Sequence, residues 1–173
     1  RWGRVITETY FPLHLTFRDP ASFTGTLERR QMGSVSLSRL ATMPLQYERR
    51  PTHISHTREE EYLITVPRLS PVEFRQIGRE VRCDPGGFIL ERGDEPYRFA
   101  YDTANELSVL KISKKSLSEK VRDPDRFCAK IIDARTGLPA LFTTMMKQLH
   151  SMPLTEGRAA EVLGRQMVEV LAL

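Results

Sequence analysis

Residues 74–90 have the sequence FRQIGREVRCDPGGFIL, and residues 95–97 have the sequence EPY. Pro85 fixes its own φ angle, and Gly86 or Gly87 can adopt the positive φ angle that a tight turn requires. The stretch therefore predicts a strand, a Pro-Gly turn and a second strand.

Short apolar runs recur on both sides of this turn, at intervals of roughly 8–12 residues. They are rich in Val, Ile, Tyr and Phe and are separated by clusters of Gly, Pro and Asp. The expected strands are 34–40, 45–50, 61–66, 72–77, 80–83, 88–91, 97–101 and 107–112. This spacing is typical of an antiparallel sandwich or barrel, because nothing between the strands is long enough for the crossover of a parallel pair.

The pattern changes to helix after Ile112. Ser113 can cap a short helix, a second helix is expected from about Pro139 to His150, and Thr155 can cap a third. In the third helix four apolar residues step by 3, 4 and 3 positions, a heptad-like seam. The seam consists of Ala160, Leu163, Met167 and Val170. It has two interpretations, packing onto the chain's own barrel or a homodimer contact.

Composition favours a globular protein of about one domain. The chain has 173 residues, 40% hydrophobic and 28% charged, with 10 Gly and 11 Pro, so collagen-like and low-complexity classes are excluded. No apolar run approaches the roughly 20 residues of a membrane helix, and residues 1–11 lack the apolar core of a signal peptide. Cys83 and Cys128 form neither a CxxC pair nor a metal-ligand spacing, so the cytoplasm is the simplest setting.

The net charge of +4 comes from 26 basic and 22 acidic residues. The basic residues are spread among acids, as in residues 58–61 (REEE), whereas nucleic-acid-binding surfaces concentrate positive charge on one face or helix. A mixed, solvated surface is favoured over direct DNA binding by this stretch.

Residues 74–97 also resemble the effector-binding domain of the AraC/XylS family of transcription regulators. That family has a Q-x-G-R … P-G-D … L … P-Y pattern, and this chain departs from it at Gly87, where the family usually has Asp. The matching residues are Gln76, Gly78-Arg79, Pro85-Gly86, Leu90 and Pro96-Tyr97; Trp2, Phe11-Pro12-Leu13, Phe23, Gly25, Gly33 and Leu37-Ser38 are similar to the family's N-terminal lead-in.

The resemblance implies a mainly β fold with C-terminal helices (α+β): a cupin-like antiparallel β-barrel over residues 1–115, then a helical segment for dimerisation or packing over residues 116–173. It implies a small-molecule effector inside the barrel, a homodimer, and control of a separate DNA-binding domain with two helix-turn-helix units. That domain is expected beyond residue 173, because no such pair of patterns occurs in this chain. No cofactor, metal or membrane is expected.

Strand alternation supplies candidate effector contacts. An inward-facing Arg49 or Arg50 can pair with a carboxylate through two hydrogen bonds, and the resemblance to sensors of aromatic acids and amines makes those the leading ligands. The full set is Tyr47, Arg49, Arg50, Tyr62, Phe74, Gln76, Tyr97 and Phe99. The alternatives are surface positions for the arginines and ordinary core positions for the rest. Arg49→Ala is expected to abolish stabilisation by the effector without unfolding the domain.

Two other functions stay open. Many cupins are metal-dependent enzymes, and His53-x-x-His56 followed by Glu59–Glu61 has suitable residue types. However, residues three apart in a strand point to opposite faces, and a polar loop is expected here. The first alternative is therefore a standalone cupin-like metal-dependent enzyme, with no catalytic or metal-binding residues assigned. The second is a module that has no ligand and only dimerises.

Overall fold

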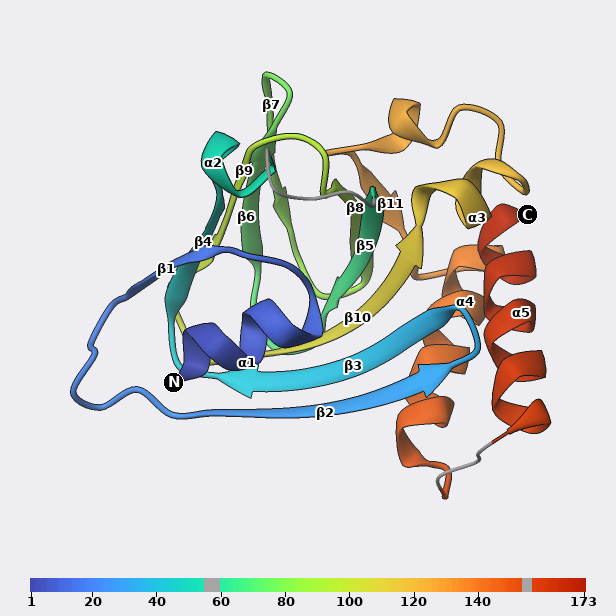
Figure 1. Cartoon of the computed structure of the whole chain (residues 1–173), viewed down its shortest axis with the longest axis horizontal. Coiled ribbons are helices and arrows are strands. Elements are labelled where there is room, and N and C mark those ends of the chain that lie inside the picture. The colour runs from blue at the N-terminus through green and yellow to red at the C-terminus, as the bar shows by residue number, and fades with distance from the viewer. Residues whose placement is uncertain (55–59, 154–156) are drawn as a thin grey trace.

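Two antiparallel β-sheets face each other in the computed structural model, which describes residues 1–54, 60–153 and 157–173 (Figure 1). The strands are β1 (His14–Phe17), β2 (Gly25–Met32), β3 (Val35–Thr42), β4 (Leu45–Arg49), β5 (Glu61–Pro67), β6 (Val72–Gln76), β7 (Arg79–Cys83), β8 (Gly87–Arg92), β9 (Tyr97–Tyr101), β10 (Asn105–Ser113) and β11 (Ile131–Asp133). One sheet has the order β1-β4-β9-β6-β7 and the other β11-β8-β5-β10-β3-β2.

The sheets do not close into a barrel. Within the described residues the edge strand β1 pairs only with β4, and the edge strand β2 pairs only with β3. The predicted mainly β fold with C-terminal helices is confirmed, and its antiparallel barrel takes the form of a jelly-roll-like sandwich with open edges. All eight strands predicted from the sequence are present, with ends shifted by a few residues.

The helices form a layer on one sheet, apart from α1 and α2. They are α1 (Trp2–Thr9), α2 (Pro51–Ile54), α3 (Lys114–Ser118), α4 (Gly137–Ser151) and α5 (Arg158–Ala172), with a 3-10 turn η1 (Pro124–Phe127). Figure 1 shows α4 and α5 side by side, and they contact β2, β3 and β11 of the six-stranded sheet. None of the described helices is long and apolar enough to cross a membrane.

The inner strands β5 and β8 of the six-stranded sheet are buried on both faces, and the protein has two cores. The first core lies between the sheets and includes Leu63, Phe74 and Phe99. The second lies between the outer face of the six-stranded sheet and the helices, and includes Ile64 of β5 and Phe142 of α4. The five-stranded sheet alternates instead: β6 buries every second residue and exposes the others.

The turns follow the glycines of the opening stretch. Gln76 and Arg79 are paired across β6 and β7, so Ile77 and Gly78 form a two-residue hairpin loop, with φ angles of 48° and 73°. Positive φ angles at both positions are those of a type I′ turn. Gly86 has a φ of 106° in the turn between β7 and β8, which confirms the predicted Pro-Gly turn.

The helix starts agree in part with the sequence. The Ser113 hydroxyl accepts a hydrogen bond from the Ser116 backbone N–H at 3.1 Å, so the predicted cap of α3 is confirmed. α4 begins at Gly137, two residues before Pro139. Thr155, the expected cap of the third helix, lies outside the described residues, and α5 begins at Arg158.

The heptad-like seam of α5 divides between two environments. Ala160 and Met167 are buried within this one chain, where α5 packs against α4, β2 and β3. Leu163 and Val170 are half-buried at the edge of the same core. Half of the seam thus packs internally, and only Leu163 and Val170 are left accessible to a second chain.

Candidate functional site

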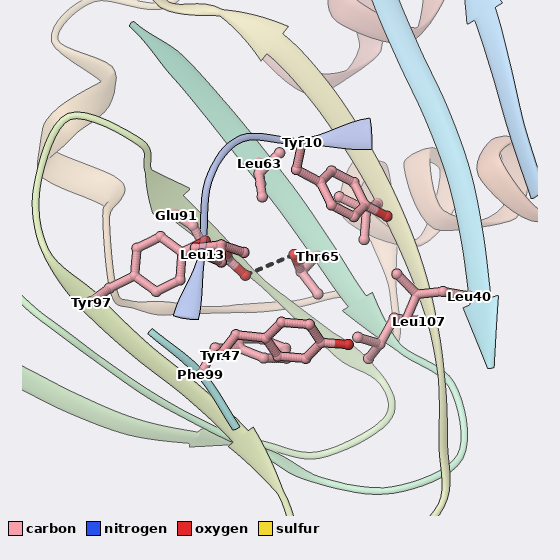
Figure 2. Close-up of a pocket in the computed structure, with 11 residues that line it drawn as sticks. Tyr10, Leu13, Leu40, Tyr47, Leu63, Thr65, Glu91, Tyr97, Phe99 and Leu107 are labelled. Atoms are coloured by element: carbon pink, nitrogen blue, oxygen red, sulfur yellow. Dashed lines mark hydrogen bonds between the residues drawn. The ribbon is translucent and has the colours of Figure 1, made fainter. Parts of the chain in front are cut away.

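A cavity of about 30 Å³ lies between the two sheets (Figure 2). It is lined by Tyr10, Leu13, Leu40, Tyr47, Leu63, Thr65, Glu91, Tyr97, Phe99, Leu107 and Val109. This volume holds about one water molecule. Any larger ligand therefore requires part of the lining to move.

The polar centre of the cavity is the carboxyl group of Glu91, on β8. Glu91 is 3% exposed, and its Oε1 accepts a hydrogen bond from the Thr65 hydroxyl at 2.8 Å (Figure 2). Burial raises the pKa of Glu91 to about 7, against hydrogen bonds from Thr65 and Tyr97 that lower it. The carboxyl group is therefore poised to exchange a proton near neutral pH.

Tyrosine rings form much of the wall around this carboxyl group. Tyr10 shares a hydrogen bond of 2.5 Å with the Ser38 hydroxyl, and Tyr47 shares one of 3.2 Å with the Tyr101 hydroxyl. Burial is the largest cause of a raised pKa at Tyr10, Tyr47 and Tyr97, so these hydroxyls stay protonated at neutral pH. The cavity thus offers aromatic faces, hydroxyl groups and one carboxyl group.

Arg49 is buried beside the cavity but does not line it. Among its contacts, Nε donates to the Gly93 carbonyl at 3.0 Å, Nη1 donates to the Pro12 carbonyl at 2.9 Å, and the guanidinium lies 4.4 Å from the centre of the Phe11 ring. With 1% of its surface exposed, Arg49 ties the segment before β1 to the loop after β8. This placement gives it a structural role in addition to any role toward a ligand.

The other predicted contacts separate into three groups. Tyr47, Tyr97 and Phe99 line the cavity. Phe74 packs behind them, with its ring centre 5.4 Å from that of Tyr97. The Gln76 amide instead holds the backbone together, because its Nε2 donates to the carbonyls of Arg92 and Glu95, and its Oε1 accepts from the Arg92 N–H.

The structure places Arg50 and Tyr62 away from the cavity. Arg50 is outside the sheet, where it forms an ion pair with Glu48 at 3.6 Å. Tyr62 belongs to the second core, and its hydroxyl donates to an Asp125 carboxylate oxygen. Alternation alone does not identify the inner face of β5, because both faces of this strand are covered.

The family model of the AraC-binding-like domain matches residues 2–173. The chain belongs to this family. The predicted relationship to AraC-type effector-binding domains is thus confirmed.

Two individual proteins are similar to this AraC-binding-like domain. The crystal structure of the AraC-like transcriptional activator CuxR superposes with a TM-score of 0.79 at 15% identity, covering 99% of this chain and 63% of that one, which shows a shared fold. The uncharacterized protein in the nit 5′ region of Bacillus sp. (strain OxB-1) is 23% identical over 167 residues, or 92% of this chain and 64% of that protein. The chain thus spans less than two thirds of the length of either protein.

Sequence reasoning missed the polar half of the site in this AraC-binding-like domain. Glu91 alternates with Ile89 on β8, and both share the inner face with Leu63 and Thr65 of β5. The available signal was a single acidic residue ending a run of three apolar ones, residues 88–90. Tyr10 was missed because the segment between α1 and β1 has no strand or helix pattern.

The metal alternative finds little support in the part of the chain that the structure describes. His53 lies on α2, where its Nδ1 accepts the Arg50 backbone N–H at 3.0 Å, whereas His56 and Glu59 lie outside the described residues. No three His, Cys, Asp or Glu residues among those described gather as metal ligands would.

Proposed function

We propose that this chain is the effector-binding and dimerisation domain of a cytoplasmic AraC-type transcription regulator, and that its effector is an amine with an aromatic or apolar body. The observation that carries the proposal is the buried Glu91 carboxyl group in an aromatic cavity between the sheets. A buried carboxylate needs a partner of opposite charge or hydrogen-bond donors, and an ammonium group supplies both.

The charges of the site favour an amine over an acid. An acid would place a second carboxylate beside Glu91, and two negative charges side by side in a buried site repel each other strongly. Arg49, the expected partner of an acid, does not line the cavity, and two of its donors are already bound to backbone carbonyls. The faces of Tyr10, Tyr47, Tyr97 and Phe99 also suit a cation or an aromatic ring.

The small volume of the cavity links effector binding to a change of conformation. Tyr10 and Leu13 come from the segment between α1 and β1, which Figure 2 shows crossing one side of the cavity. A ligand larger than one water would displace these two side chains, and the segment that carries them. Effector binding would therefore select a conformation with a different position of the N-terminal segment.

In the complete regulator this change would alter how two copies present their DNA-binding domains. We place the contact between copies on the accessible half of the α5 seam, Leu163 and Val170. Analytical sedimentation compares the oligomeric state of the wild type with that of Leu163→Asp. A dimeric wild type and a monomeric variant support this contact, whereas a variant that stays dimeric shows that Leu163 is not part of it.

A thermal-shift panel tests the effector class. It compares 2-phenylethylamine and other arylalkyl amines with the alcohol and acid of the same shape, 2-phenylethanol and phenylacetate. The proposal expects the melting temperature to rise with at least one amine and not with its matching acid. Stabilisation by acids and not by amines would contradict it, and stabilisation by no compound of any class would favour a module that only dimerises.

A further inference from the structure

A second and larger cavity lies outside the sandwich, between α4 and the outer face of the six-stranded sheet. Its volume is about 430 Å³, compared with about 30 Å³ for the interior cavity. Its walls come from β3, β10, the end of β5, the C-terminal half of α4 and the turn at residues 85–87. Cavities of 300–1,000 Å³ are typical of sites for small molecules.

Arg68 is fixed in the wall of this α4 groove. Its Nε donates to the Ser108 hydroxyl at 3.1 Å, and its Nη2 donates to the Thr143 carbonyl at 3.2 Å, so it joins β10 to α4. Arg68 forms no ion pair with a carboxylate of the described residues. A guanidinium has five N–H donors, and these two bonds leave donors available toward the groove.

Positive charge predominates around Arg68. Lys147 of α4 also lines the groove and likewise has no carboxylate partner within the described ranges. Arg39 lines it as well, paired with Glu28 at 2.9 Å, and Glu106 is the acidic residue in the lining. Such a groove attracts an anion, because its cations outnumber its carboxylates.

The protonation state of His150 is consistent with the positive charge of the groove. Its Nε2 lies 3.1 Å from the Ser108 hydroxyl, in the same groove. The pKa of His150 is lowered to about 4, first by burial and then by the positive charges of nearby arginines, whereas the carboxylate of Glu28 acts in the opposite direction. His150 is therefore a neutral polar group beside the cations.

We propose that the α4 groove binds a small molecule that carries a carboxylate or phosphate group, held by Arg68 and Lys147. Ser108 and His150 supply neutral hydrogen-bonding groups beside the anion. Because the ligand would contact both β10 and α4, its binding would stabilise the helical layer against the sheet. This site lies on the other side of the six-stranded sheet from Glu91, so it is separate from the amine site proposed above.

Titration calorimetry with two probes tests the groove, using inorganic phosphate and succinate at constant ionic strength. The variants are Arg68→Gln, Lys147→Gln and the control Arg75→Gln, which removes the same charge from an exposed position on β6. We expect at least one anion to bind the wild type. Arg68→Gln should weaken binding about tenfold and Lys147→Gln about threefold, whereas Arg75→Gln should leave it unchanged.

The proposal is overturned if neither anion binds the wild type, or if all three variants bind as the wild type does. Equal weakening by all three variants also overturns it, because that result indicates general charge screening. If Arg68→Gln does not fold, the anion affinities of Lys147→Gln and Arg75→Gln still test the proposal. Both positions are exposed, so both variants are expected to fold. A preference for phosphate or for succinate identifies the anion class, and Glu91→Gln should bind either anion as the wild type does.

Discussion

The Glu91 carboxyl group and the Thr65 hydroxyl are hydrogen-bonded at 2.8 Å on adjacent strands, and both face the interior of the sandwich. Each residue is held by an inner strand of the six-stranded sheet, β8 for Glu91 and β5 for Thr65. A site built on strands keeps its geometry better than one built on loops. The acidic group of the proposed amine site is thus fixed, and the part of the lining that we propose to move is the segment before β1.

The raised pKa of Glu91 makes stability depend on pH. Because its pKa of about 7 in the folded protein lies above the ordinary 4.5, the folded state keeps a proton that the unfolded chain releases between these values. The free energy of unfolding should therefore fall, by on the order of 3 kcal/mol, as the pH rises from 4.5 to about 7. Urea unfolding across this range measures the slope.

Two variants separate the effect of Glu91 from that of other groups. In Glu91→Gln the free energy of unfolding should no longer decrease between these pH values. In Glu73→Gln, which changes an exposed position on β6, it should decrease as in the wild type. If the curves of Glu91→Gln and the wild type run parallel, Glu91 does not titrate in this window.

Arg49→Ala should destabilise the domain itself, contrary to the expectation from sequence. The substitution leaves the carbonyls of Pro12 and Gly93 without their donors and removes the stacking on Phe11, for a loss of about 3 kcal/mol. Arg50→Ala, which loses one exposed ion pair, should cost less than about 0.5 kcal/mol. Denaturant titration compares them; a stable Arg49→Ala that fails to bind amines would return Arg49 to a direct role in binding.

The sequence predicted the strands well because each is short, apolar and bounded by turn residues. It did not reveal α1, β1 and β2, since an edge strand such as β2 carries charged residues on a half-solvated surface. Of the residues that it proposed as ligand contacts, Tyr47, Tyr97 and Phe99 line the cavity, and they lie on a sheet with one solvated face. It placed Tyr62 on the inner face of β5 although this side chain belongs to the outer core, because a strand covered on both sides has no polar face to mark the outside.

Ile77→Asn should stabilise the protein. Ile77 has a φ of 48° in the β6–β7 loop and is 41% exposed, so a β-branched side chain is held in the left-handed region with little burial in return. Asn tolerates this conformation, and a gain of about 1 kcal/mol is expected. Ile77→Thr keeps a β-branched side chain at this position and should not be more stable than the wild type. Thermal unfolding compares the two variants, and equal stability would contradict the backbone strain inferred at residue 77.

Gly164→Ala should destabilise the protein although alanine favours helices. A Cβ atom at Gly164 would lie 2.1 Å from the carbonyl oxygen of Met32, so α5 could not keep its contact with β2. A loss of about 2 to 3 kcal/mol is expected, whereas Gln166→Ala on the exposed side of the helix should be neutral. A Gly164→Ala variant as stable as Gln166→Ala would show that α5 does not pack here.

The most direct test of the amine site is calorimetric titration of the amine that stabilises the wild type best into the wild type, Glu91→Gln and Glu73→Gln. Both variants remove one carboxylate, but only Glu91 lies in the cavity. Loss of a charged hydrogen-bonding partner should raise Kd at least about tenfold in Glu91→Gln and leave it unchanged in Glu73→Gln. An unchanged Kd in Glu91→Gln would contradict recognition of the effector by this carboxyl group.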